Sequence, residues 1–191
     1  MRKDLTKQIH SSFLSCGKDT EVILKKLFIE YPEHAEKLKR LLVIQAKDCL
    51  DNTESQVYKD ELEKMTLPML IKQGYIKTNP KIKLPEDEEV KSYIIISYDN
   101  FTPNATNPKF RDCTISFDVI CNSDYWDLGD YRERPIEIVG YIDGLLNEAK
   151  LSGIGALNFA QCKELLITPD LNGYTLSFRA VHGSDDIIPR E

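Results

Sequence analysis

The chain has 191 residues, of which 41% are hydrophobic and 29% charged, so it can bury a core and is too apolar for bulk disorder. Its net charge of −6 argues against binding nucleic acid by general charge attraction, because phosphate contacts need an excess of Lys and Arg. No apolar run approaches the roughly 18 residues of a membrane span, and no signal peptide is evident, so we expect a soluble protein whose five cysteines are free thiols.

Residues 1–80 carry apolar side chains at helical spacing and predict an N-terminal helical region. The expected helices run up to Gly17, from Asp19 to Pro32, over residues 33–50 and over residues 54–65, with the last one ending near Pro68. Residues 78–89 contain two prolines and a run of four acidic residues, which indicates a linker or an exposed loop.

Residues 81–191 predict strands around a single helix. The expected strands cover residues 93–98, 110–121, part of 156–168, and 174–180. Alternation is clearest from Cys113 to Cys121, where every second residue is apolar. The third strand loses its alternation midway, which predicts a bulge or two short pieces. The segment from Pro169 to Gly173 indicates a turn.

The helix of this second region is expected to open at Pro135, because a proline N–H would have no partner at the first helical position. It should end near Lys150. The order of elements predicts an α+β fold with a mainly antiparallel four-stranded sheet, β-β-α-β-β, covered by a helix. We therefore expect an N-terminal helical region over residues 1–80 and an α+β domain over residues 81–191.

Catalytic residues are not evident in the sequence. His182 stands beside Ser184 and Asp185, but three contiguous residues in a tail do not form a triad, which is assembled from separate rigid elements. His10 and His34 lie in charged helical segments and are expected at the surface. We expect no enzyme and no cofactor.

A metal site is the remaining chemical alternative. Asp124, Asp127 and Asp130 recur at every third residue, and carboxylates suit Ca²⁺ or Mg²⁺. The segment lacks the spacing of a calcium loop, and solvent exposure explains the charges equally well. A small metal-dependent hydrolase therefore stays the enzymatic alternative.

The loop over residues 122–134 combines aromatic and charged side chains. Tyr125, Trp126 and Tyr131 lie close to Arg132 and Arg134, a composition typical of contact hot spots. Trp126 is equally compatible with closing the core of its own subunit. The interface candidates of this loop are these five residues.

The first predicted strand is apolar on both faces, with Ile94 and Ile96 on one face and Ile95 on the other. A sheet covered by a helix on one side leaves its other side bare, so Ile95 would be exposed unless a neighbouring subunit or the N-terminal helices cover it. Burial of such a side chain is worth about 1.5 to 3 kcal/mol. We expect Ile95 at a contact between like subunits, with Asp118 and Arg179 fixing the register.

Residues 94–186 also carry a family resemblance. Its pieces are the alternating strand Thr114–Asn122, a loop with Trp126, the helix start Arg134–Pro135, the helix end Ile142–Asn147, then Gly153–Gly155 and Asn172–Leu176. This order resembles the tail terminator proteins of long-tailed bacteriophages.

The resemblance implies a structural virion protein that forms a homohexameric ring at the head-proximal end of the tail tube. Such a ring ends tube growth and joins the tail to the head. The implied partners are the tail tube protein and a head connector or stopper protein, with DNA only as passing cargo and no membrane. Assembly would take place in the host bacterial cytoplasm. Another neck protein, for head completion or as a stopper, is the alternative.

Overall fold

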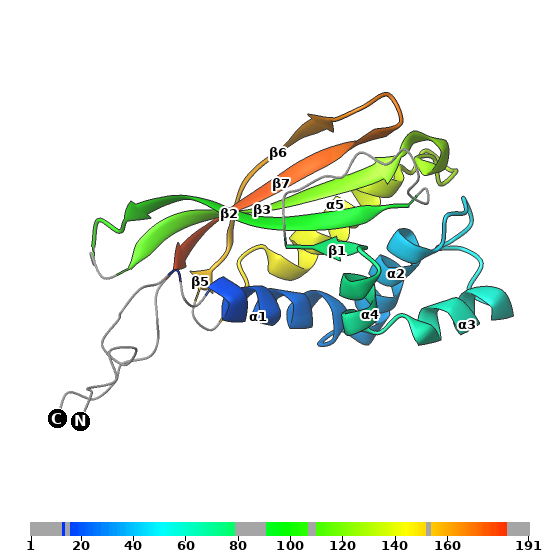
Figure 1. Ribbon diagram of the computed structural model, residues 1–191, viewed down its shortest axis with the longest axis horizontal. Helices are drawn as coiled ribbons and strands as arrows, with labels where there is room; N and C mark the ends of the chain where they lie inside the picture. Colours follow the sequence, from blue (N-terminus) through cyan, green and yellow to red (C-terminus); the bar gives the residue numbers. More distant parts are fainter. Residues whose placement is uncertain (1–12, 14–15, 79–90, 107–109, 152–153, 183–191) are drawn as a thin grey trace.

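The computed structural model describes residue 13 and residues 16–78, 91–106, 110–151 and 154–182. Figure 1 shows a twisted sheet with α5 against it, while α1 to α4 lie along the lower side of the view. The α+β class is confirmed. Within the described ranges, no helix is long and apolar enough to span a bilayer.

Four helices form the N-terminal part. They are α1 (Cys16–Phe28), α2 (Pro32–Val43), α3 (Gln56–Lys64) and α4 (Leu67–Lys72). Both Pro32 and Pro68 lie in the first turn of a helix, where a proline costs no hydrogen bond. Pro68 therefore sits inside α4, a helix that the sequence did not predict. The expected helix over residues 33–50 was too long, since α2 ends at Val43.

The sheet has five strands in the order β1-β2-β3-β7-β6. They are β1 (Ile76–Lys77), β2 (Tyr93–Pro103), β3 (Arg111–Asn122), β6 (Asn158–Leu166) and β7 (Leu171–His182). β1 pairs with β2 in parallel, while the other neighbours are antiparallel. The predicted, mainly antiparallel sheet of four strands was therefore wrong in its number of strands, because β1 adds a fifth strand whose parallel pairing makes the sheet mixed. A strand of two residues has no periodicity from which to predict it.

The remaining elements are η3 (Ser123–Tyr125), α5 (Arg134–Leu146), β4 (Lys150–Leu151) and β5 (Gly155–Ala156). Of these, α5 is the predicted helix and ends earlier than expected, whereas η3 and the short pair β4 and β5 were not predicted. The expected irregularity of the third strand is confirmed as a register shift between Phe159 and Gln161 of β6. The turn before β7 is shorter than predicted, because Gly173 is already paired with Ile120 inside the sheet.

One hydrophobic core joins the N-terminal helices to the sheet. It contains Leu27 of α1 and Leu38 of α2 together with Phe117 of β3, Ile138 of α5 and Phe178 of β7. The rings of Phe117 and Phe178 meet edge to face, with centroids 5.9 Å apart. The domain boundary that the sequence predicts near residue 80 falls in residues 79–90, which lie outside the described residues. His10, Ser184 and Asp185 also lie outside the described residues.

Candidate assembly surface

Arg134 fixes the loop over residues 122–134 to its own chain. Its side chain is fully buried and donates to the carbonyl oxygens of Leu41 at 2.6 Å, Ile44 at 3.0 Å and Ala46 at 2.8 Å. Nε donates to the carbonyl of Tyr125 at 2.7 Å. Arg134 is therefore an internal tether, and its selection as an interface residue was wrong.

The place of Arg134 at the start of α5 has an electrostatic reason. A cation is disfavoured at the positive end of a helix dipole. The guanidinium instead lies against carbonyls at and just beyond the end of α2, the negative end of that helix. The two helix ends thus meet across one buried charge.

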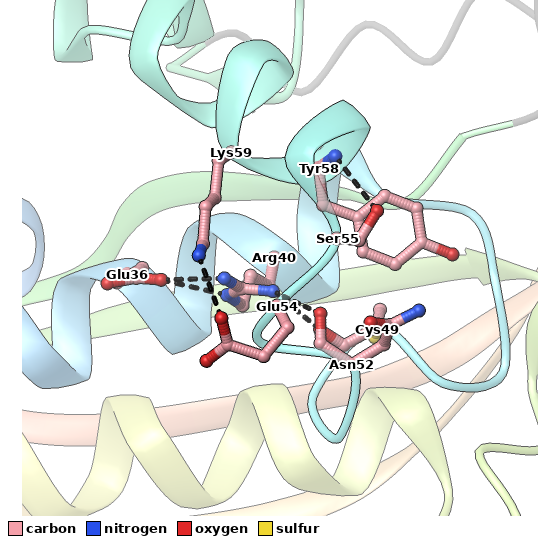
Figure 2. Close-up of polar contacts among 8 residues, drawn as sticks. All are labelled: Glu36, Arg40, Cys49, Asn52, Glu54, Ser55, Tyr58 and Lys59. Atoms are coloured by element: carbon pink, nitrogen blue, oxygen red, sulfur yellow. Dashed lines mark hydrogen bonds and ion pairs between the residues drawn. The ribbon is translucent and has the colours of Figure 1, made fainter.

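A second arginine holds the same stretch of chain from the other side. Figure 2 shows Arg40 between the carboxylate of Glu36 and the carbonyls of Cys49 and Asn52. Its bonds to the two carbonyls are 3.3 Å long, and those to Glu36 are 2.8 and 2.9 Å. The α2–α3 connection is therefore a fixed platform rather than a loose linker.

Two ion pairs at the surface extend the docking of the loop onto this platform. Arg132 pairs with Asp51, and Lys47 Nζ lies 2.7 Å from Asp127 Oδ2. The hydrogen bond from Lys47 lowers the pKa of the Asp127 carboxyl. Asp127 is thus engaged with a lysine, and among the residues that the structure describes no cluster of His, Cys, Asp or Glu has an arrangement that could hold a metal ion.

The aromatic residues of the loop divide into supporting and exposed ones. Trp126 is half-buried against the main core, with its ring 6.3 Å from that of Tyr174. Tyr125 is also half-buried. Tyr131 is fully exposed and has a φ of 63°. Of the aromatic candidates, Tyr131 alone is presented outward in full.

Ile95 does not need a neighbouring subunit for its burial. It is 1% exposed and belongs to a small second cluster with Tyr93 and Ile120. Partly buried side chains around the β6–β7 turn complete this cluster: Leu165, Ile167 and Leu171. The expectation that a partner or the N-terminal helices would cover Ile95 was wrong, because the twisted sheet and its own turn cover it.

Asp118 and Arg179 share the polar, helix-free face of the sheet but do not pair with each other. Asp118 accepts a hydrogen bond from Thr175 Oγ1 at 2.6 Å, whereas Arg179 is exposed and lies opposite Thr114 in the ladder. A shallow polar depression on this face is lined by both residues. Their role in fixing an intersubunit register stays a prediction.

The edge strand β6 presents a surface that the sequence did not reveal. Its nine residues pair only with β7 among the described strands. Phe159 and Leu166 are 50% and 76% exposed. Both share the helix-side face, because they lie opposite Phe178 and Asn172, yet α5 leaves them uncovered. We call β6 with its exposed Phe159 and Leu166 the β6 surface.

The loop over residues 122–134 begins beside one end of β6. The end of β3 and the end of β6 meet at the same end of the sheet, since Asn122 pairs with Leu171 and Leu166 with Asn172. The loop that carries Tyr131 starts there, and Ser123 donates to the carbonyl of Pro169 at 3.0 Å. An unpaired strand edge with exposed apolar side chains is a template for pairing with another chain.

Residues 35–180 match the family model YomW, which covers most of the chain. The protein belongs to the YomW family. This family is phage-derived, so the expected phage origin is confirmed at that level. The YomW region includes the whole β6 surface and the Arg134 tether, whereas α1 and His182 lie outside it.

Among solved structures, the chain is similar to a chain of a "Virion of native gene transfer agent (GTA) particle". Identity is 21%, the match covers 66% of this chain and 92% of that chain, and the TM-score is 0.38. A comparison with curated proteins gives no match for this YomW protein.

Proposed function

We propose that this YomW-family protein is a structural subunit of a phage virion, which assembles into a ring that ends the tail tube and joins it to the head. The observation that carries the proposal is the β6 surface on a phage-derived chain. A nine-residue edge with exposed apolar side chains is costly for an isolated subunit and useful in an assembly.

The fold supports an assembly role in a second way. The loop over residues 122–134 is tied to the α2–α3 platform by a buried arginine and two ion pairs. A partner that meets Tyr131 therefore meets a surface held in place before binding, which lowers the ordering cost of association. The tail tube protein and a head connector or stopper remain the proposed partners.

Substitution of Leu166 by lysine tests the surface. We expect Leu166→Lys to weaken subunit association roughly 10- to 100-fold, which corresponds to the loss of about 1.5 to 3 kcal/mol of apolar burial. The melting temperature of the isolated subunit should stay unchanged, because Leu166 is 76% exposed there. Sedimentation velocity and negative-stain images of the purified protein, with tail tubes added, measure assembly.

Val57→Lys provides the matched control, since Val57 is 66% exposed on α3 and lies outside the β6 surface. It should assemble like the unchanged protein. Equal assembly by both variants would remove the β6 surface from the interface.

Deletion from a phage genome tests the place in the virion. If the ring ends tail growth, particles without the protein should carry overlong or unjoined tails beside DNA-filled heads. Electron microscopy of lysates gives the tail lengths. Tails of normal length that remain separate from leaking heads would instead indicate a head-completion or stopper protein, and normal joined particles would contradict both.

A further inference from the structure

Three reactive side chains meet where the first helix touches the end of the last strand. Sγ of Cys16 lies 3.7 Å from Nε2 of His182, and Nδ1 of the same ring lies 2.7 Å from Oδ2 of Asp19. Cys16 and Asp19 come from α1, while His182 ends β7. His182 thus has a thiol at one ring nitrogen and a carboxylate at the other.

Ser184 and Asp185 are sequence neighbours of His182 and therefore do not come from separate elements. Cys16 and Asp19 do, because they lie on α1 whereas His182 ends β7. A nucleophilic relay needs its members on separate rigid elements, in the order nucleophile, base and orienting group. His182 and Asp19 are 0% and 2% exposed, so the base and its orienting carboxylate are enclosed in protein. The Asp19 carboxylate lies beside Nδ1, where its charge favours a proton on that nitrogen and so leaves the lone pair of Nε2 on the side of the thiol.

The thiol itself is within reach of small molecules. Cys16 is half-buried rather than enclosed, and it is the first residue of α1. A methyl group built on neighbouring Gly17 would meet no described atom within 4 Å.

The surroundings keep the thiol protonated at rest. Burial and then the negative charge of Asp19 raise the pKa of Cys16. Tyr98 of β2 and Cys113 of β3 face the same cluster, since both lie on the helix-side face of the sheet and interact electrostatically with Cys16 and Asp19. Thr20 joins α1 to this side through a 3.0 Å contact with the Tyr98 hydroxyl. A thiolate is therefore formed only when a base removes the proton.

We propose that Cys16 is a nucleophilic thiol that accepts an activated acyl group, with His182 as its base and Asp19 as a positioning residue. Sγ attacks the acyl carbon, and the new S–C bond replaces the bond to the leaving group, which departs with its electron pair. The thiol proton passes to Nε2 of His182, and the imidazolium is stabilised by Asp19. The product is a thioester on Cys16.

Acylation of the purified full-length chain by p-nitrophenyl acetate tests the proposal. Cys162, an exposed free thiol on β6, is the internal reference in every sample. We expect Cys16 to take up one acetyl group at least about 100-fold faster than Cys162, the scale of general base catalysis. Release of p-nitrophenolate gives the rate, and peptide mass spectrometry gives the site.

Variants separate a reactive site from a structural contact. Cys16→Ala should abolish the fast phase, and Cys162→Ala should leave it unchanged. In Asp19→Asn the fast phase should slow, and its pH profile should change from a plateau above neutral pH, set by a histidine base, to a continuous rise with thiol ionisation. Rescue of the plateau by Asp19→Glu would support positioning by the carboxylate.

A measurement on the unchanged protein is sufficient to overturn the proposal. The test therefore does not depend on whether the variants fold. Cys16 and Cys162 acetylated at equal rates in the folded chain would make the cluster a structural contact between α1 and β7. A Cys16 rate that rises continuously with pH in the unchanged protein would have the same meaning. We expect ring assembly to be independent of the Cys16 site. If the protein forms no ring, the acylation result still stands.

Discussion

Replacing Gly173 with alanine is expected to disrupt the centre of the sheet. A Cβ at this position would lie 1.8 Å from the carbonyl oxygen of Val119 and 2.8 Å from its carbonyl carbon. Both are backbone atoms of β3, so no side chain can rotate away to make room. Glycine in a strand often marks such a close approach of a second backbone. We expect the free energy of unfolding to fall by roughly 3 to 5 kcal/mol, because losses of this size are typical of steric clashes that the backbone cannot relieve.

Urea unfolding followed by circular dichroism measures this loss, and Gly144→Ala is its matched control. Gly144 lies in α5, and a Cβ added there meets nothing within 4 Å. Alanine should stabilise the helix by about 0.5 to 1 kcal/mol, because glycine has the larger conformational freedom to lose. A Gly173→Ala protein with an unfolding midpoint close to the unchanged one would show that β3 and β7 separate easily.

Replacing Arg134 with methionine is expected to have a loss of similar size. Methionine keeps much of the apolar stem but removes one donor from four carbonyl groups, two of them in buried hydrogen bonds and two in partly buried ones. An unsatisfied buried polar group costs about 1 to 3 kcal/mol, and partial relaxation recovers some of the sum. We expect the free energy of unfolding to fall by roughly 3 to 5 kcal/mol, which thermal and urea unfolding both report. Arg134→Lys should be nearly as damaging, because an ammonium cannot reproduce the planar fork.

Arg132→Met is the control for the loss of a positive charge from the same loop. Arg132 pairs with Asp51 at the surface, where its side chain is 28% exposed. Such pairs contribute about 0 to 1 kcal/mol, so this variant should unfold close to the unchanged protein. Equal effects of the two substitutions would mean that net charge, rather than the buried hydrogen bonds, determines stability.

Strands and helices were predicted best from the sequence where a local pattern of apolar residues or a proline indicates them directly. The alternation from Cys113 to Cys121 corresponds to side chains that are buried in β3, because period two places every second residue on the covered face. Pro135 marked the start of α5 correctly, since the first helical turn tolerates proline. These features depend only on neighbouring residues.

Features that depend on distant pairs were missed. No residue near Arg134 in the sequence predicts that its side chain binds the carbonyls of residues 41–46. The available signal was its position at the start of a helix, where the helix dipole disfavours a cation and favours a partner elsewhere. The burial of Ile95 depends on the turn after β6, and the relay at His182 depends on a helix 166 residues earlier. The β6 surface was missed because its register shift hides which side chains stay uncovered.

The position of β7 in the sheet has a consequence for synthesis. β7 is the last of the described strands, yet it lies between β3 and β6. A nascent chain that has not yet released residues up to 182 from the ribosome exposes β3 as an open edge, and β6 then lacks its partner among the described strands. Strand pairing over such sequence distances is slow, and open edges favour aggregation. Folding of this protein therefore completes only after translation of β7, and a chaperone that shields β3 until then would raise its yield.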